Sequence, residues 1–178
     1  MLRKLLYRYS ARLPCRLIYP DGRPYLERYY LGRLFGLTFY LHRFVNGDGD
    51  RALHDHPWRW CGALVLAGGY RERRLRWFDP RHGFHAVERA VGAGRLNLMN
   101  ARSFHQILAA RPDTWTLFAH SGKIKEWGFL EARPAASTED DPALHYHRDR
   151  DPTSHHQWWR SAPRGADAGR APPHPGGA

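Results

Sequence analysis

The chain has 178 residues, of which 42% are hydrophobic and 25% charged, as in one ordinary globular domain with short extensions. No run approaches the roughly 18 apolar residues of a membrane-spanning helix, and two cysteines are too few for a disulfide scaffold. We therefore expect a cytoplasmic protein with no membrane partner. The net charge of +11 invites nucleic acid as a partner, but no zinc finger or recognition helix accompanies it.

The first residues have the pattern of a short helix. Met1 to Leu13 place leucines and a tyrosine at helical spacing, with basic residues between them, and Pro14 ends the pattern. We expect this helix to pack on the domain, within an N-terminal arm of residues 1–24. A partner helix or a membrane-surface helix is the alternative.

From Tyr25 to Glu131, short aromatic and β-branched runs alternate with turn residues such as Gly68-Gly69. Short strands separated by frequent turns are typical of an all-β sandwich or barrel, which we place at residues 25–131. The predicted strands are Tyr25–Leu31, Leu37–Phe44, Ala52–His56, Trp60–Leu66, Tyr70–Phe78, His85–Val91, Leu96–Met99, Phe104–Leu108, Trp115–His120 and Trp127–Glu131.

Residues 132–178 are polar, first acidic, then rich in histidine, and finally rich in proline and glycine. Such a composition buries too little apolar surface to offset the entropy of ordering, so we expect a largely disordered tail. Trp158-Trp159 is its one candidate docking point. Deleting the residues after about Pro163 is accordingly expected to leave the melting temperature unchanged.

The segment His54-Asp55-His56-Pro57-Trp58 carries the strongest chemical signal. Residues two apart on a strand point to the same face, so His54 and His56 can bind one metal ion from one side. A third ligand must come from a strand that is adjacent in space, and His105 is the best candidate. Solvated surface histidines, and for His105 a core histidine, are the alternative interpretations.

The spacing around these histidines resembles the two metal-binding motifs of the cupin family. In the first motif, His54 and His56 fit, Cys61 stands where a glutamate is expected, and Gly68 closes the motif. In the second motif, Gly94 and His105 keep the family spacing. The stretches around His-Asp-His-Pro-Trp are also similar to a group of small bacterial and phage-borne single-domain cupins.

The resemblance implies a jelly-roll barrel that holds one divalent metal ion. Three neutral imidazoles without the glutamate suit Fe(II), with Zn, Ni, Mn or Co as alternatives. The thiol dioxygenases of this superfamily are similar, with three histidines and, in some members, a cysteine near the glutamate position. Strand parity nevertheless predicts that Cys61 points away from the site and is a buried core thiol.

Other side chains are candidates for the same pocket. Arg102 precedes His105 by three residues and is expected to bind a carboxylate or phosphate of the substrate, an exposed arginine being the alternative. Glu72 is the main acidic alternative for a further ligand, and His42 is expected to make a structural hydrogen bond.

These observations predict a metal-dependent enzyme, an oxidoreductase of dioxygenase type, that acts on a small anionic molecule. The alternative is a non-catalytic cupin module that binds a small ligand or a partner protein. Nucleic-acid binding is a third interpretation, which we do not expect because the sequence contains no known nucleic-acid recognition motif. The sequence leaves a homodimer open and does not define the substrate.

Overall fold

The structure is a computed structural model, described for residues 1–19, 22, 24–45, 53–79, 83–132, 144–149 and 157–175. These residues form one α-helix, α1 (Leu2–Ser10), a short 3-10 helix, η2 (Trp158–Arg160), and two six-stranded antiparallel sheets. Neither helix is long and apolar enough to cross a membrane.

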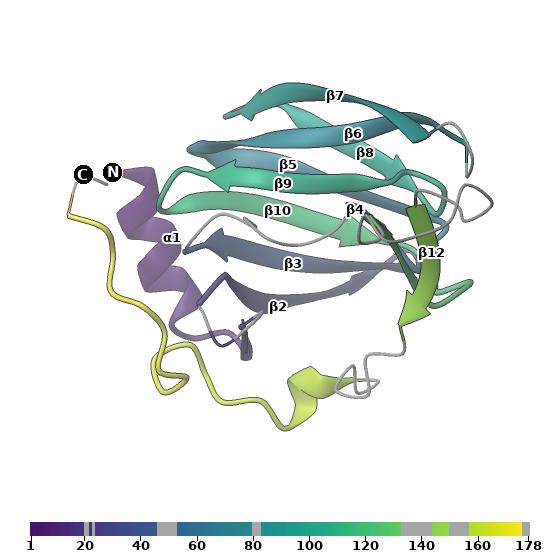
Figure 1. Ribbon diagram of the computed structural model, residues 1–178. Coiled ribbons are helices and arrows are strands. Elements are labelled where there is room, and N and C mark those ends of the chain that lie inside the picture. Colours follow the sequence, from purple (N-terminus) through teal and green to yellow (C-terminus); the bar gives the residue numbers. More distant parts are fainter. Residues whose placement is uncertain are drawn as a thin grey trace.

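The first sheet carries α1 on its outer side (Figure 1). Its strands, in spatial order, are β1 (Cys15–Ile18), β2 (Leu26–Leu34), β3 (Leu37–Phe44), β10 (Thr114–His120), β5 (Trp60–Ala67) and β8 (Leu96–Asn100).

The second sheet faces the first. Its strands, in spatial order, are β12 (Leu144–Asp149), β11 (Trp127–Ala132), β4 (Leu53–Asp55), β9 (His105–Ala110), β6 (Gly69–Asp79) and β7 (Gly83–Gly92). Between β3 and β11 the chain passes from one sheet to the other at nearly every connection, the β6–β7 hairpin being the exception. This is the expected all-β, jelly-roll-type barrel with a short N-terminal helix.

The ten predicted strands all occur among the described residues, although Ala52 of the third lies outside them. β1 and β12 are additional, and β12 extends the second sheet beyond Glu131. The core between the sheets contains mostly aromatic and β-branched side chains, namely Tyr25, Leu26, Phe44, Val65, Tyr70, Val91 and Ile107.

The helix packs on the domain as expected, but through a different face. Leu6 and Tyr7 contact the buried cluster that contains Tyr29 and Trp115. The leucines at positions 2 and 5 are exposed, so the apolar spacing alone did not identify the buried face.

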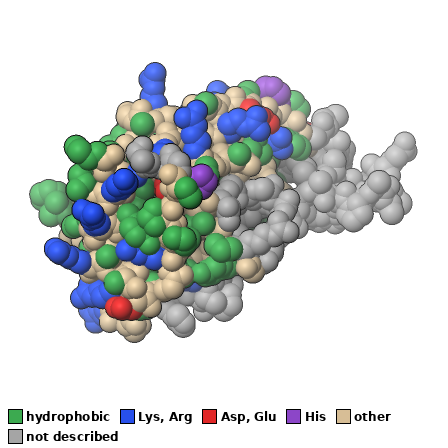
Figure 2. Space-filling view, turned by 90° about the vertical axis from the view of Figure 1, so that its left-hand side faces the viewer, with side chains coloured by type: hydrophobic (Ala, Val, Ile, Leu, Met, Phe, Trp, Pro, Cys, Tyr) green, Lys and Arg blue, Asp and Glu red, His purple; other side chains and the backbone are tan. Residues whose placement is uncertain are grey.

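Basic side chains are spread over the surface. Figure 2 shows one face, on which Lys and Arg side chains are scattered among hydrophobic ones and acidic side chains are few. This face presents no continuous basic stripe of the kind that tracks a phosphate backbone.

The C-terminal residues 157–175, here called the C-terminal strap, run along the first sheet and α1 (Figure 1). Trp158 stacks on Tyr40 and Trp159 on Tyr30, at ring-centroid distances of 6.0 and 4.2 Å. The predicted docking point is therefore present. Backbone hydrogen bonds continue the contact, including that from the Cys15 N–H to the carbonyl of Pro163 at 2.9 Å.

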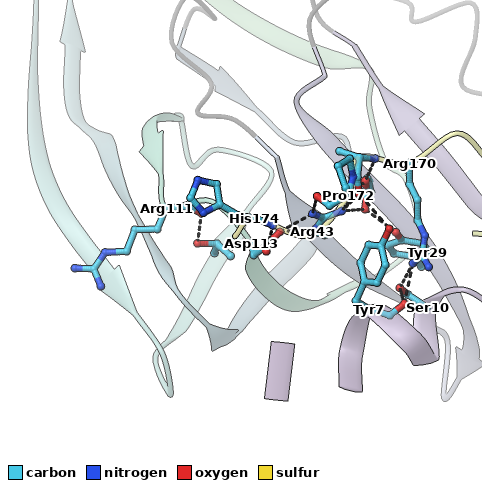
Figure 3. A network of polar contacts seen from close by, with 12 residues as sticks. Tyr7, Ser10, Tyr29, Arg43, Arg111, Asp113, Arg170, Pro172 and His174 are labelled. Atoms are coloured by element: carbon cyan, nitrogen blue, oxygen red, sulfur yellow. Dashed lines mark hydrogen bonds and ion pairs between the residues drawn. The ribbon is translucent and has the colours of Figure 1, made fainter. Parts of the chain in front are cut away.

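Beyond this point, the strap enters a buried network of polar groups (Figure 3). The guanidinium of Arg43 donates to the carbonyls of Ala171 and Pro172 at 2.6 and 2.7 Å. It also pairs with the carboxylates of Glu27 and Asp113. In return, the Ala171 N–H donates to Glu27 at 2.8 Å.

The strap therefore differs from the expectation of a tail without packed structure. Composition measures only the apolar surface that a segment can bury, whereas this segment is held by backbone hydrogen bonds and a buried arginine. Of the tail, residues 133–143, 150–156 and 176–178 lie outside the described residues.

Candidate metal centre

The structure brings the imidazoles of His54, His56 and His105 together in the interior. His54 on β4 is paired directly with His105 on the neighbouring β9, and His56 follows the end of β4. All three side chains are buried, and one nitrogen of each lies within 4.8 Å of the others. The Nε2 atoms of His56 and His105 are 2.8 Å apart. The third histidine thus comes from an adjacent strand, as the sequence predicted.

The residue between the two motif histidines fixes the strand that carries them. Asp55 points away from the cluster, where one carboxylate oxygen accepts the Gly128 N–H at 3.0 Å and the other pairs with Lys125. These contacts tie β4 to the start of β11. A strand of only three residues is therefore anchored from the side opposite the histidines.

Glu72 lies behind His105 rather than beside the other histidines. Its carboxylate is fully buried and stands 2.9 Å from Nδ1 of His105. Burial alone would raise the pKa of Glu72, but hydrogen bonds from His105 and Asn97 and the charge of Arg74 hold it below its usual value. The ionised carboxylate accepts the Nδ1–H of His105, which leaves the Nε2 lone pair directed at the cluster.

Cys61 occupies the corresponding position behind His56. Its Sγ atom is 3.1 Å from Nδ1 of His56, and burial raises the pKa of the thiol to about 12. Cys61 is thus a buried core thiol, as predicted, but it faces the site. The parity argument fails because β4 ends at Asp55 and a turn precedes β5, so that Trp60 is 59% exposed and Cys61 only 3%.

The two partners have a consequence for protonation. Because Nδ1 of His105 donates to Glu72, Nε2 of His105 is an acceptor. The short contact between the two Nε2 atoms then requires His56 to donate its Nε2–H. Nδ1 of His56 is therefore unprotonated and accepts a hydrogen bond from the Cys61 thiol. Metal ligation would instead need a bare Nε2 on His56, with the proton on Nδ1. A thiol can accept as well as donate, so Cys61 suits both tautomers.

A cavity of about 90 Å³ opens in front of the three histidines, between the inner faces of the two sheets. One water-sized group needs about 10–15 Å³ of such space, so the cavity admits roughly six to nine of them. Its walls are largely aromatic and aliphatic, with Tyr25, Leu26, Phe44, Trp58, Met99, Ile107, Phe118 and Trp127 among the lining residues. Its size and its largely apolar lining suit a small organic molecule.

Arg102 is not among the residues that line this cavity. It lies exposed on the turn between β8 and β9, where its backbone N–H donates to the Asn100 side chain at 2.9 Å. The turn places it on the surface, although His105 begins the next strand. The sequence-based role in substrate binding is therefore not supported by its position.

Arg28 lines the cavity instead, and the sequence analysis missed it. Its Nε donates to Nε2 of His42 at 3.0 Å, so His42 makes the structural hydrogen bond that was expected. The available signal was strand pairing, because Arg28 stands opposite His42 on adjacent strands. Reading each strand alone could not reveal that both side chains face the same space.

We expect replacement of Glu72 by glutamine to weaken metal binding by about 10–100-fold, because outer partners of ligating histidines typically contribute that much. The amide keeps the size of the side chain but loses the charge that orients His105. Competition titration with a chromophoric chelator measures the affinity. Glu88→Gln on the exposed face of β7 is the matched control. Equal affinities of the Glu72 variant and the control would contradict the orienting role.

Comparison with known proteins adds likeness in structure only. No protein-family model matches the chain, and no curated protein matches it. Fe(II)-HppE with the alternative substrate (S)-1-HPP is 17% identical over 64% of this chain and 57% of that one, with a TM-score of 0.47. Streptomyces albus HEPD with 2-hydroxyethylphosphonate and Fe(II) bound is 14% identical over 61% and 24%, with a TM-score of 0.46.

A single-residue variant of the oxalate decarboxylase of Bacillus subtilis is 18% identical over 64% of this chain and 28% of that one, with a TM-score of 0.45. The chain thus spans little more than half of the HppE chain and about a quarter of the other two. The function of this protein has to be inferred from its own side chains.

Proposed function

We propose that this protein is a metal-dependent enzyme, of the dioxygenase type, that acts on a small molecule in the cavity between its sheets. One divalent metal ion, with Fe(II) favoured, would be held by His54, His56 and His105. The observation that carries the proposal is the convergence of three buried imidazole nitrogens within 4.8 Å at the wall of a largely apolar cavity.

The donor set fits such an ion. Imidazole suits iron, zinc, nickel and copper, and three neutral donors leave coordination positions open toward the cavity. When bound, the metal supplies Lewis acidity and, if it is iron, one-electron redox chemistry with oxygen.

The residues of the chain itself have separate tasks. Glu72 orients His105 through Nδ1, and Cys61 accepts or donates at Nδ1 of His56. Aromatic walls from both sheets, such as Phe118 and Trp127, exclude water and strengthen electrostatic interactions inside the cavity. Among the described lining residues there is no carboxylate, so these walls offer no carboxylate as a general acid or base.

The test uses tag-free protein, because a histidine tag would bind metal itself. Anaerobic reconstitution with Fe(II) should give one metal ion per chain, and an oxygen electrode should record uptake with members of a panel of small organic acids. The zinc-loaded protein is the control, since zinc has no redox chemistry and should support no oxygen uptake. Iron-dependent turnover without oxygen uptake would exclude a dioxygenase.

The alternative is a module that binds a small ligand without converting it. Tight binding of a panel compound with no turnover in the iron-loaded protein would establish it. Failure to bind any divalent metal would overturn the proposed function.

A further inference from the structure

Three polar side chains cross the inner face of the first sheet, opposite the histidine cluster. Arg28 on β2 pairs in register with His42 on β3, and His42 pairs with Thr116 on β10. All three line the cavity. We call Arg28, His42 and Thr116 the polar row. The histidine cluster lies on β4 and β9 of the second sheet and just beyond β4, so the cavity separates the two polar groups.

Thr116 is the first indication that the polar row binds something. The side chain is buried, with 1% exposure, and its Oγ1 has no hydrogen-bond partner among the described residues. An unsatisfied buried hydroxyl costs about 1–3 kcal/mol, and valine would have the same shape without that cost. A hydroxyl at a cavity wall is explained if a ligand in the cavity accepts or donates there.

Arg28 provides the charge. Its Nε donates to Nε2 of His42, and its guanidinium lies over the Tyr40 ring at 5.5 Å. Burial, and after it the positive charge of Arg28, keep the pKa of His42 well below its usual value. His42 is thus neutral and can accept from Arg28 without repelling it. His42 is a positioning residue that holds the Arg28 side chain at the wall of the cavity.

Packing links the polar row to the candidate metal centre. The His42 ring lies 4.9 Å from the Phe118 ring, which in turn lies 6.3 Å from the His56 ring. The space between the two polar groups is therefore short, and its wall is aromatic. A ligand of the size that the cavity admits can reach both.

We propose that the polar row is the subsite for an anionic group, so that the cavity binds a small carboxylate between Arg28 and Thr116 on one side and the histidine cluster on the other. The inference deepens the proposed function. It rests on that function only for the end of the ligand that lies at the histidine cluster. Arg28 recognises the carboxylate through its planar guanidinium, and Thr116 donates its hydroxyl proton.

The test compares 3-hydroxypropionate with 3-hydroxypropionamide, which differ only in the charged group. Calorimetric titration of the iron-reconstituted protein under nitrogen should show at least tenfold tighter binding of the acid, as expected for hydrogen bonds to a charged group. Arg28→Met should abolish this preference and leave the amide affinity within about twofold. Arg33→Met, on the exposed end of β2, is the matched control.

Thr116→Val separates binding from folding. It should weaken binding of the acid by about tenfold or more, the effect of one hydrogen bond to a charged group, while the urea midpoint stays unchanged or rises because an unsatisfied hydroxyl is lost. Thr116→Ser should restore the affinity. If Thr116 were purely structural, its replacement would lower the midpoint and leave the affinity unchanged.

Equal binding of acid and amide by the wild-type protein, or an unchanged preference in Arg28→Met, would overturn the anionic subsite. Metal content measured on the same samples reports the proposed function separately. If the wild-type protein holds no metal, the same titrations on the metal-free protein still show whether an acid preference depends on Arg28. The two proposals can therefore fail independently.

Discussion

Replacement of His105 by alanine is expected to lower metal affinity on the order of a hundredfold or more. Four-ligand zinc sites bind with roughly 10–16 kcal/mol, which is about 2.5–4 kcal/mol per ligand, and each 1.4 kcal/mol is tenfold. His105 is also the histidine of the cluster that Glu72 orients, through the hydrogen bond at Nδ1. Metal analysis after dialysis against a weak chelator should fall from about one ion per chain to almost none.

The matched control is His85→Ala, which removes an exposed histidine of β7 that lies outside the cluster. Its metal content should equal that of the wild-type protein. Because His105→Ala also strips Glu72 of a partner, His54→Ala serves as a second variant that leaves the contact between Glu72 and His105 in place. If both cluster variants keep their metal, the ion is bound elsewhere, for example by the histidines of the tail.

Much of the fold follows from the period of the sequence. Burial alternates along β8 as the strand geometry requires, but Asn97 and Met99 are buried while Leu96 and Leu98 are exposed, so the apolar residues do not mark the inward face there. β12 was missed because its alternation is short, with only Leu144 and Tyr146 apolar, and lies within a polar tail; the strand forms by pairing with β11. Pairing between strands is a tertiary event that a local pattern does not encode.

In the candidate metal centre, too, local patterns predicted some residues, and pairing between strands decided the others. His54 and His56 were identified because two residues on one strand share a face, and the spacing of a known motif indicated His105. Arg102 was misplaced because a turn intervenes before β9, and Arg28 was missed because β2 is distant in sequence. Alternation within a strand predicts which face of the sheet each of its side chains occupies. It does not predict how a turn reorients the chain or which strand lies next to it.

The buried network beneath the C-terminal strap leads to the second large effect. Arg43→Met is expected to lower the free energy of unfolding by about 3–5 kcal/mol, because it leaves the buried carboxylates of Glu27 and Asp113 without their cation. That is a large share of the roughly 5–15 kcal/mol that stabilises a typical domain. Urea unfolding, followed by tryptophan fluorescence, measures the loss.

A truncation that ends before Gln157 tests the strap itself, and here the structure reverses the expectation from composition. The truncated chain keeps the pairs of Arg43 with Glu27 and Asp113, but loses the two carbonyls that Arg43 binds and the stacking of Trp158 on Tyr40. Its urea midpoint should therefore fall, by less than that of Arg43→Met.

Arg33→Met, which removes an exposed arginine, should stay within about 0.5 kcal/mol of the wild-type protein. If the truncated chain unfolds at the wild-type midpoint while Arg43→Met does not, the three charged side chains stabilise the domain by themselves. The contacts of the strap would then contribute no stability, because the hydrogen bonds that they form would only replace equivalent bonds to water.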